Sequence, residues 1–261
     1  MKSTFGNLAL ALQNAQQSGT PVYSGWSLFP DPLVARAVAS GPFEALLIDC
    51  QHGHMDFSQS QAMTIAIAQA GKAPLLRIPV ADFAFVSRAL DFGVQGIVAP
   101  MINSADEARA LVDAAKYPPV GKRSFAPFGA CALYGMETPD YVQAANQDCI
   151  VFAMIETQEA LDNLDAILAV EGLDGVFVGP ADLSLTLLKG ARVDMDCDLA
   201  NAAYEMVAQQ AAAAGKLSGI YAFNTDYAKR YAGFGYNLVA VGSDTGYLAA
   251  GMQQMAEALK A

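Results

Sequence analysis

The sequence has little positive charge, few cysteines and no long hydrophobic run. It holds 15 Lys and Arg against 26 Asp and Glu, for a net charge of -11, so it repels phosphate backbones and nucleic acid is not an expected partner. Four cysteines without CxxC spacing favour free thiols in a reducing compartment. No stretch of 18 apolar residues is free of charges, Pro and Gly, and the start is too polar for a signal peptide. We therefore expect a cytoplasmic protein that binds no membrane.

Nucleotide-binding loops are also missing. No GxGxxG follows the first predicted strand, and no GxxxxGK[ST] occurs anywhere. What is present is apolar: 54% of the 261 residues are hydrophobic and 16% are charged. This length and composition predict one domain over residues 1–261 with a large core. The composition is apolar for a monomer, which indicates buried subunit contacts and a homo-oligomer.

Short apolar segments alternate with amphipathic helical ones through most of the chain. Strands are expected at 22–28, 44–49, 74–78, 95–100, 150–155, 174–179, 217–222 and 237–242. Helices are expected at 31–40, 58–71, 82–91, 104–116, 158–170, 197–215, 225–233 and 245–260. The strands are continuously apolar, as parallel strands buried on both faces should be. Eight strand–helix units predict an α/β fold, a (β/α)8 TIM barrel.

The irregular segment 117–149 interrupts this alternation. It contains Lys122 and Arg123 and a short helix is expected near 138–147. Because long loops in compact domains are usually functional or form interfaces, we expect it to fold over the barrel mouth.

Two carboxylates follow predicted strands, Glu156 after IVFAMI and Asp182 after GVFVGPA. Residues at the carboxyl ends of barrel strands can meet in space. Mg²⁺ usually takes one or two protein carboxylates and keeps other positions for water and substrate, so this pair is a candidate metal site. The alternative is that these acids cap the helices that follow.

The two histidines of the chain, His52 and His54, lie together in DCQHGHMD. Histidine is the usual proton carrier near neutral pH, and Asp49 is placed three residues before His52 to orient its imidazole. A His-x-His pair can instead bind Zn²⁺ or Co²⁺, although the chain has no third histidine. The remaining interpretation is a histidine held by loop hydrogen bonds.

Arg77 ends an otherwise apolar strand, where a guanidinium is costly without an anion. It is a candidate clamp for a substrate carboxylate or oxyanion, or else a structural partner of Asp49 or Asp91. The turn formed by Gly179, Pro180, Ala181 and Asp182 opens a helical segment whose amides can bind an anion. Trp26, the one tryptophan, follows the first strand and is a candidate pocket wall or a packing residue.

At these residues the chain resembles the HpcH/HpaI class II aldolase family, which cleaves 2-oxo-4-hydroxy acids to pyruvate and an aldehyde. The resemblance covers nearly the whole length. It lies in GWSL at 25–28, LLIDCQHG at 46–53, LLRIP at 75–79, ALDFGVQGIVAPMINSADEAR at 89–109, YPPVGKR at 117–123, MIET at 154–157, VEGLDGVFVGPADLS at 170–184 and AKRYAGFG at 228–235.

The resemblance implies a role for each matching residue. Glu156 and Asp182 correspond to ligands of Mg²⁺, Mn²⁺ or Co²⁺, and His52 to a base paired with Asp49. Arg77 corresponds to the substrate-binding arginine, and the amides of Ala181 and Asp182 to the cradle of the pyruvate carboxylate. Asp91 corresponds to an acid that reaches the base of a neighbouring subunit. The family also implies a hexamer, a trimer of dimers, with C-terminal helices exchanged between subunits.

Two positions depart from the family pattern. Gln51 stands where D-G-E-H has glutamate, which removes a negative charge beside the metal. Tyr221 stands where a small aliphatic residue is usual, and with Ala222 and Phe223 it is expected to narrow the aldehyde pocket or give it a hydroxyl.

The resulting hypothesis is a metal-dependent pyruvate aldolase without a Schiff-base lysine. Two alternatives stay open: a citrate-lyase-like enzyme of a CoA thioester, with Lys122 and Arg123 as candidate cations, and a catalytically silent barrel that binds a 2-oxo acid. The sequence leaves the aldehyde open among succinic semialdehyde, lactaldehyde, tartronic semialdehyde and glyceraldehyde.

Overall fold

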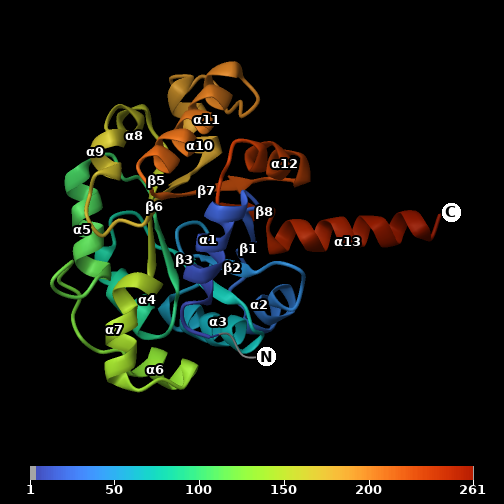
Figure 1. The fold of residues 1–261 in the computed structure, drawn as a ribbon. Coiled ribbons are helices and arrows are strands. Elements are labelled where there is room, and N and C mark those ends of the chain that lie inside the picture. The colour runs from blue at the N-terminus through green and yellow to red at the C-terminus, as the bar shows by residue number, and fades with distance from the viewer. Residues whose placement is uncertain (1–3, 261) are drawn as a thin grey trace.

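The chain folds into a closed barrel of eight parallel strands, seen in Figure 1. The computed structural model describes residues 4–260. Each strand pairs with its neighbours in sequence, and β1 closes the barrel against β8. The strands are β1 (Val22–Ser27), β2 (Ala45–Asp49), β3 (Ala73–Arg77), β4 (Gly96–Ala99), β5 (Ile150–Ile155), β6 (Gly175–Val178), β7 (Leu217–Ala222) and β8 (Leu238–Val241). The predicted (β/α)8 barrel is confirmed, with every strand end within one residue of its prediction.

Helices surround the barrel. They are α1 (Asn7–Ser18), α2 (Pro32–Ala39), α3 (Phe57–Gln69), α4 (Phe83–Asp91), α5 (Ala105–Ala115), α6 (Phe128–Tyr134), α7 (Thr138–Asp148), α8 (Gln158–Asp162), α9 (Leu164–Leu168), α10 (Pro180–Leu187), α11 (Asp198–Ala213), α12 (Thr225–Gly233) and α13 (Asp244–Ala258). The sequence analysis did not assign α1 or α6, and the helix expected at 158–170 is split into α8 and α9. Helix ends follow local signals, as in the capping box of Ser104 and Glu107 that opens α5.

The N-terminal end of the barrel is closed by α1. Leu8, Leu12 and Ala15 of this helix are buried in one cluster with residues that begin the strands, including Val22, Ala45 and Ala73. The Leu8 amide also donates to Oε1 of Gln95, just before β4. The opposite end of the barrel, where the strands finish, is therefore the end at which a site can open.

The alternation of side chains along each strand decides which of them point into that end of the barrel. Leu47, Leu75 and Met154 fill the barrel interior, whereas Leu46 and Ile48 pack outward near α2 and α3. Because successive side chains of a strand alternate between faces, the next inward positions after these apolar residues are two residues on. Those positions hold Asp49, Arg77 and Glu156.

The segment 117–149 does not fold over the barrel mouth, so that prediction was wrong. Its helix α6 packs against α4, and α7 packs against α1 at the other end of the barrel. Tyr141 of α7 is fully buried: its hydroxyl donates to the Leu90 carbonyl, and Phe5 lies 4.6 Å from its ring. The apolar face of α7 thus packs beside the barrel, against α1 and α4, and not over its mouth. The helix expected at 138–147 is confirmed.

The last helix, α13, projects away from the barrel in Figure 1. Within its described residues only Asp244, the first, is buried. Leu248, Met252 and Met255 are 52%, 65% and 72% exposed. Across residues 4–260, no helix combines the length and apolar character that a membrane crossing requires.

Candidate active site

A pocket of about 250 Å³ opens where the strands end. It is lined by Trp26, Leu28, Asp49, His52, Arg77, Met154, Glu156, Gly179, Pro180, Ala181, Asp182, Tyr221 and Phe223. Of the residues that the sequence analysis considered for the site, those outside this lining are Gln51, His54, Asp91, Lys122, Arg123 and Ala222. Residues from β1, β2, β3, β5, β6 and β7 or from the segments just after them therefore meet here, as the barrel predicts.

Asp49 and Arg77 form a buried ion pair at the floor of the pocket. Arg77 donates from Nε to Oδ1 at 2.9 Å and from Nη2 to Oδ2 at 2.6 Å, and the residues are 1% and 7% exposed. Trp26 donates its indole N–H to Oδ2 and lies under the guanidinium at 4.8 Å. Burial opposes ionisation of Asp49, but the hydrogen bonds and charge of Arg77 outweigh it and lower the pKa of Asp49. The structural partner considered for Arg77 is thus Asp49.

His52 lines the pocket but its imidazole is not oriented by Asp49, contrary to expectation. The Asp49 carboxylate instead accepts the backbone amides of Gln51 and His52 at 3.0 and 3.2 Å. The physical reason is that a guanidinium offers two parallel charge-assisted bonds, which are stronger than one bond to an imidazole. Within residues 4–260 the His52 ring has no hydrogen-bond partner, and it is exposed. His54 is exposed and lies outside the pocket lining.

Glu156 is a buried carboxylate, 2% exposed. Its Oε2 accepts the Met101 amide at 2.8 Å. Burial, with the charges of Asp182 and Asp49, raises the pKa of Glu156 to about 7 against the Met101 bond and the charge of Arg77. Met101 adopts a left-handed φ of 58°, an uncommon conformation for this residue type that clusters at functional sites. No sequence signal we used identified Met101.

Gly179 leaves room for Glu156. A Cβ at this position would overlap Oε1 of the Glu156 carboxylate. Next in the chain, Pro180 takes the first position of α10, which has no side-chain cap. The amides of Ala181 and Asp182 lie in the first helical turn, where N–H groups have no partner within the helix. They can therefore bind an anion.

Glu156 and Asp182 are the carboxylates of the pocket that no cationic side chain neutralises through a hydrogen bond among the described residues. Of the two, Glu156 is buried and has a raised pKa, whereas Asp182 is exposed, and a buried carboxylate of this kind is the group that a cation would stabilise. Within residues 4–260 no three or more His, Cys, Asp and Glu side chains form a metal-binding group. Two carboxylates suit an oxygen-preferring ion that keeps positions for water and substrate, rather than Zn²⁺ in a His-x-His site.

An aromatic wall, Trp26, Tyr221 and Phe223, borders the pocket. The Tyr221 ring lies 4.9 Å from Trp26 and 4.8 Å from Phe223, both edge-on. Burial raises the pKa of Tyr221, with the Arg77 charge acting in the opposite sense, so the hydroxyl stays neutral. Leu28, which the sequence analysis did not single out, extends the apolar lining.

Asp244 positions the loop that carries Leu28. Its carboxylate accepts the Leu28 amide at 2.9 Å and the Ser27 hydroxyl at 2.7 Å, and it is 1% exposed. Sequence reasoning missed this residue because it reads as an ordinary acid in the first turn of the last helix.

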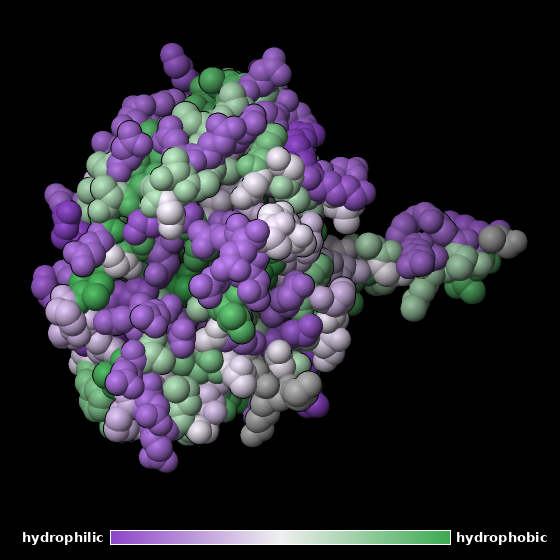
Figure 2. Space-filling model, in the orientation of Figure 1, coloured by the Kyte–Doolittle hydropathy of each residue, from purple (hydrophilic) through white to green (hydrophobic). Residues whose placement is uncertain are grey.

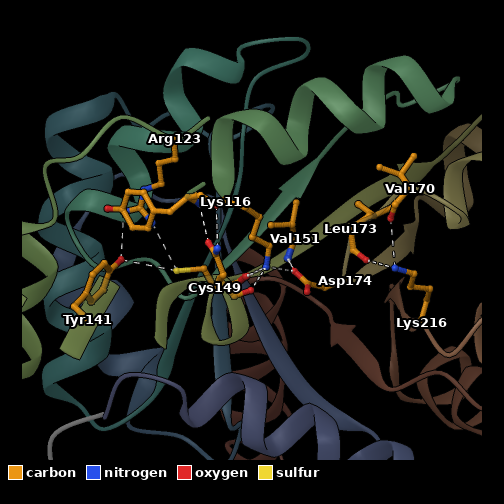
Figure 3. Close-up of polar contacts among 11 residues, drawn as sticks. Lys116, Arg123, Tyr141, Cys149, Val151, Val170, Leu173, Asp174 and Lys216 are labelled. Carbon is orange, nitrogen blue, oxygen red and sulfur yellow. Dashed lines mark hydrogen bonds and ion pairs between the residues drawn. The ribbon is translucent and has the colours of Figure 1, made fainter. Parts of the chain in front are cut away.

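The cations of segment 116–123 lie away from the pocket. Figure 3 shows Arg123 directed toward Tyr141 and Cys149. Its Nη2 pairs with Asp91 Oδ1 at 2.8 Å, so Asp91, which was predicted as a catalytic residue, lies outside the pocket of its own chain. Lys122 pairs with Asp113 at 2.6 Å. Neither cation lines the pocket.

Lys116 is the centre of a second buried polar group in Figure 3. Its Nζ donates to the carbonyls of Asn146 and Cys149 and to Oδ2 of Asp174, at 2.9, 2.6 and 2.7 Å. Asp174 also accepts the Val151 amide. Cys149 and Val151 lie at the start of β5 and Asp174 directly precedes β6, so this group ties together the starts of the two strands whose other ends lead to Glu156 and Asp182.

Comparison with known proteins agrees with this geometry. The HpcH/HpaI aldolase/citrate lyase family matches residues 25–250. A hydroxypyruvate/pyruvate aldolase of Rhizorhabdus wittichii is 39% identical, covering 91% of this chain and 93% of that protein. A 4-hydroxy-2-oxo-heptane-1,7-dioate aldolase of Salmonella arizonae is 38% identical, covering 94% and 93%.

Among solved structures, an HpcH/HpaI aldolase/citrate lyase family protein of Burkholderia cenocepacia superposes with a TM-score of 0.87 at 29% identity. The superposition covers 97% of this chain and all of that one. The likeness thus extends over both the barrel and the elements that carry the pocket. The chain belongs to the HpcH/HpaI aldolase/citrate lyase family and is a carbon–carbon lyase of the aldolase type.

Proposed function

We propose that this chain is a divalent-metal-dependent aldolase that reversibly cleaves a 2-oxo-4-hydroxy acid to pyruvate and an aldehyde. The observation that carries the proposal is the buried Glu156 carboxylate, with Asp182, in a pocket that also contains Arg77 and His52. Relatives of two aldolase types, named above, support this activity. Which hydroxy-oxo acid is cleaved is taken up below.

Glu156 and Asp182 would hold Mg²⁺, Mn²⁺ or Co²⁺. The residues fit, because the negative charge of the carboxylates exceeds the positive charge of the lining residues, and a cation would offset the burial and the neighbouring carboxylate charges that raise the Glu156 pKa. When bound, such an ion acts as a Lewis acid that makes the methyl protons of pyruvate easier to remove. Gln51, in place of the family's glutamate, weakens the electrostatic support of the ion but leaves both ligands in place.

The side chains of the pocket supply binding and proton transfer. The amides of Ala181 and Asp182 would receive the oxo-acid carboxylate. Arg77, held by Asp49, would donate its remaining N–H groups to the developing enolate oxygen. His52 would take the methyl proton, because its imidazole lines the pocket and has no partner among the described residues. Asp49 then acts through Arg77 and through the backbone of residues 51 and 52.

Asp91 has a proposed role only between subunits. In its own chain it pairs with Arg123, and its side chain is 22% exposed. We keep the family-based proposal that it approaches the base of a neighbouring subunit, with Arg123 holding the carboxylate in place.

A citrate-lyase-like activity on a CoA thioester is less well supported. It relied on Lys122 and Arg123 as cations, and these pair with Asp113 and Asp91 instead of lining the pocket. A catalytically silent barrel is disfavoured because both proposed metal ligands and the histidine lie in one pocket.

We also propose a cytoplasmic homo-oligomer, a hexamer built as a trimer of dimers, in which α13 is exchanged between subunits. Leu248, Met252 and Met255 form an exposed apolar stripe, and Figure 2 shows green side chains along one side of the projecting helix. A groove lined by Val38, Phe43 and other residues lies beside the start of α13. Met252→Asp with Met255→Asp should yield smaller species by analytical ultracentrifugation, whereas unchanged mass would place the interface elsewhere.

The decisive experiment follows deuterium entering the pyruvate methyl group by NMR. Protein stripped with EDTA is incubated with pyruvate in D₂O, and Mg²⁺ or Mn²⁺ is then added. Exchange is expected only after metal addition, followed by formation of aldol products from added aldehydes, detected by mass spectrometry. Exchange that persists in EDTA, or in Glu156→Ala and Asp182→Ala proteins, would contradict the proposal.

A further inference from the structure

We infer that the aldehyde taken by this pocket is uncharged and has an apolar or aromatic body, rather than carrying a second carboxylate. The inference rests on the proposed function and narrows its substrate class. It discriminates between the two kinds of relative, because a 4-hydroxy-2-oxoheptanedioate would release succinic semialdehyde, which is anionic at neutral pH.

The pocket lining carries more negative than positive charge. Of the lining residues, all within the described part of the chain, Arg77 is the one lysine or arginine. Three carboxylates line the same space, those of Asp49, Glu156 and Asp182. A divalent ion would balance Glu156 and Asp182, and Arg77 balances Asp49. No lysine or arginine that this chain contributes to the lining is then left for a second substrate carboxylate.

Arg77 has few N–H donors left for the aldehyde. Of its five N–H donors, one on Nε and one on Nη2 are given to Asp49, and its plane is covered by Trp26 at 4.8 Å. The donors that remain are the ones proposed to act on the oxo acid. With those donors assigned to the oxo acid, the far end of the aldehyde is left to the other lining residues.

Leu28, Trp26, Tyr221 and Phe223 are apolar or aromatic, and Phe223 is 47% exposed at the edge of the pocket. The Tyr221 hydroxyl makes no hydrogen bond to another residue of the described chain, so it can donate to a neutral oxygen of the substrate. Moving a carboxylate from water against such a wall costs free energy, because these side chains provide no cation to offset the loss of hydration. The same transfer is favourable in free energy for an alkyl or aryl group, because it removes apolar surface from water.

The chemistry requires no further reactant. Loss of a methyl proton gives the pyruvate enolate, whose C3 attacks the aldehyde carbon and forms the C–C bond. The C=O electron pair moves to the aldehyde oxygen, which takes the proton that was removed from the methyl group. The aldehyde substituent takes no part in these steps, so selectivity lies in the wall that contacts it.

Two acceptors of the same chain length test the inference, succinic semialdehyde and its methyl ester. With full-length protein, Mn²⁺ and pyruvate, kcat/KM for the ester should exceed that for the acid by at least about tenfold, the lower end of the cost of burying an unpaired polar group. Benzaldehyde should also be accepted. An equal or higher value for the acid would overturn the inference.

Variants of the wall sharpen the test. Tyr221→Arg, which places a guanidinium beside the acceptor, should lower the ester-to-acid ratio by at least about tenfold. Its control, Tyr221→Phe, keeps the ring and should hold the ratio within about threefold. Phe223→Arg, at the more exposed position, gives the same test if Tyr221→Arg does not fold. A ratio that none of these arginines alters would also overturn the inference.

Deuterium exchange into pyruvate without any aldehyde tests the aldolase proposal separately from the proposed class of aldehyde. Metal-dependent exchange together with a preference for the acid refutes the acceptor class alone. Failure of the parent protein to exchange in any metal refutes the aldolase proposal itself.

Discussion

The two ends of the barrel treat buried charge differently. At the N-terminal end, Lys116 donates to three oxygens and its partner Asp174 accepts two donors. At the other end, Asp49 is matched by Arg77, but the buried Glu156 has, among the described residues, only the Met101 amide as a hydrogen-bond donor. The first arrangement is complete within the chain, whereas the second has a surplus of negative charge.

This difference separates structural from functional burial. The Lys116 group, whose charges are paired within the chain, holds the starts of β5 and β6 together and has no unpaired charge that a ligand would neutralise. A surplus carboxylate is held in place by the surrounding fold although it destabilises the metal-free chain, and perturbed pKa values of this kind cluster at functional sites. The surplus is useful only if a cation enters the pocket.

The largest effect is expected from Glu156→Gln, which keeps the shape of the side chain and removes its charge. Metal-dependent deuterium exchange should be lost, because one of two proposed ligands is gone. Isothermal titration with Mn²⁺ measures the binding directly. Asp174→Asn, the matched change at the other end of the barrel, should retain Mn²⁺ binding in the folded fraction. Equal Mn²⁺ affinity in the parent and Glu156→Gln would show that the surplus carboxylate does not bind the metal, and the proposed difference between the two ends of the barrel would be wrong.

His52→Ala should slow exchange of the pyruvate methyl protons by about 10²–10⁴, as expected for loss of a general base. Because the side chain is exposed, Tm should change little. NMR exchange rates and thermal melts of the same samples check both expectations, and His54→Ala provides the control outside the pocket. A rate as fast as the parent's would assign the proton transfer to another group.

Lys116→Met should destabilise the fold by about 3–5 kcal/mol, since the long stem is kept while Asp174 and two carbonyls lose their donor. Urea unfolding followed by circular dichroism measures the change. The Mn²⁺ affinity of the protein that remains folded should match the parent's, because Lys116 lies at the closed end of the barrel. A loss of affinity without loss of stability would show that the two ends are coupled.

The smallest effect concerns pH. Because Glu156 has a pKa of about 7 in the folded chain against an ordinary 4.5, the folded state holds a proton that the unfolded state has released between these values. Metal-free stability should therefore fall as pH rises from 4.5 to 7, by roughly 3 kcal/mol from this group. Glu156→Gln should lack that part of the decline in EDTA, which isolates it from other acids. Parallel pH profiles of parent and variant would contradict the raised pKa.

The sequence singled out Glu156, Asp182 and Arg77 because a charged residue at or shortly after the end of an apolar strand has few explanations. The structure brings all three into one pocket, and their roles stay predictions. His52 was found from its residue type, but its expected bond to Asp49 was wrong. Competition by Arg77 for the same oxygens depends on the pairing of β2 with β3, which places Asp49 opposite Arg77.

Other features had no local sequence signal. The left-handed Met101 and the Asp244 carboxylate act through contacts with residues 55 and more than 200 positions away. Segment 117–149 was expected at the mouth because its composition resembles a loop, yet Tyr141 finds a buried position beside α4 and near α1. Contacts of this kind are set by packing between distant elements.

By itself the sequence determined the barrel, the order of its strands and the residue types at their ends, because the apolar strands, the amphipathic helices that alternate with them and the local helix caps are each encoded within short segments. Only the tertiary structure decided which charges neutralise one another and which carboxylate is left in surplus. The reason is that pKa and hydrogen-bond partner depend on burial and on distances across the barrel, and no stretch of neighbouring residues contains that information.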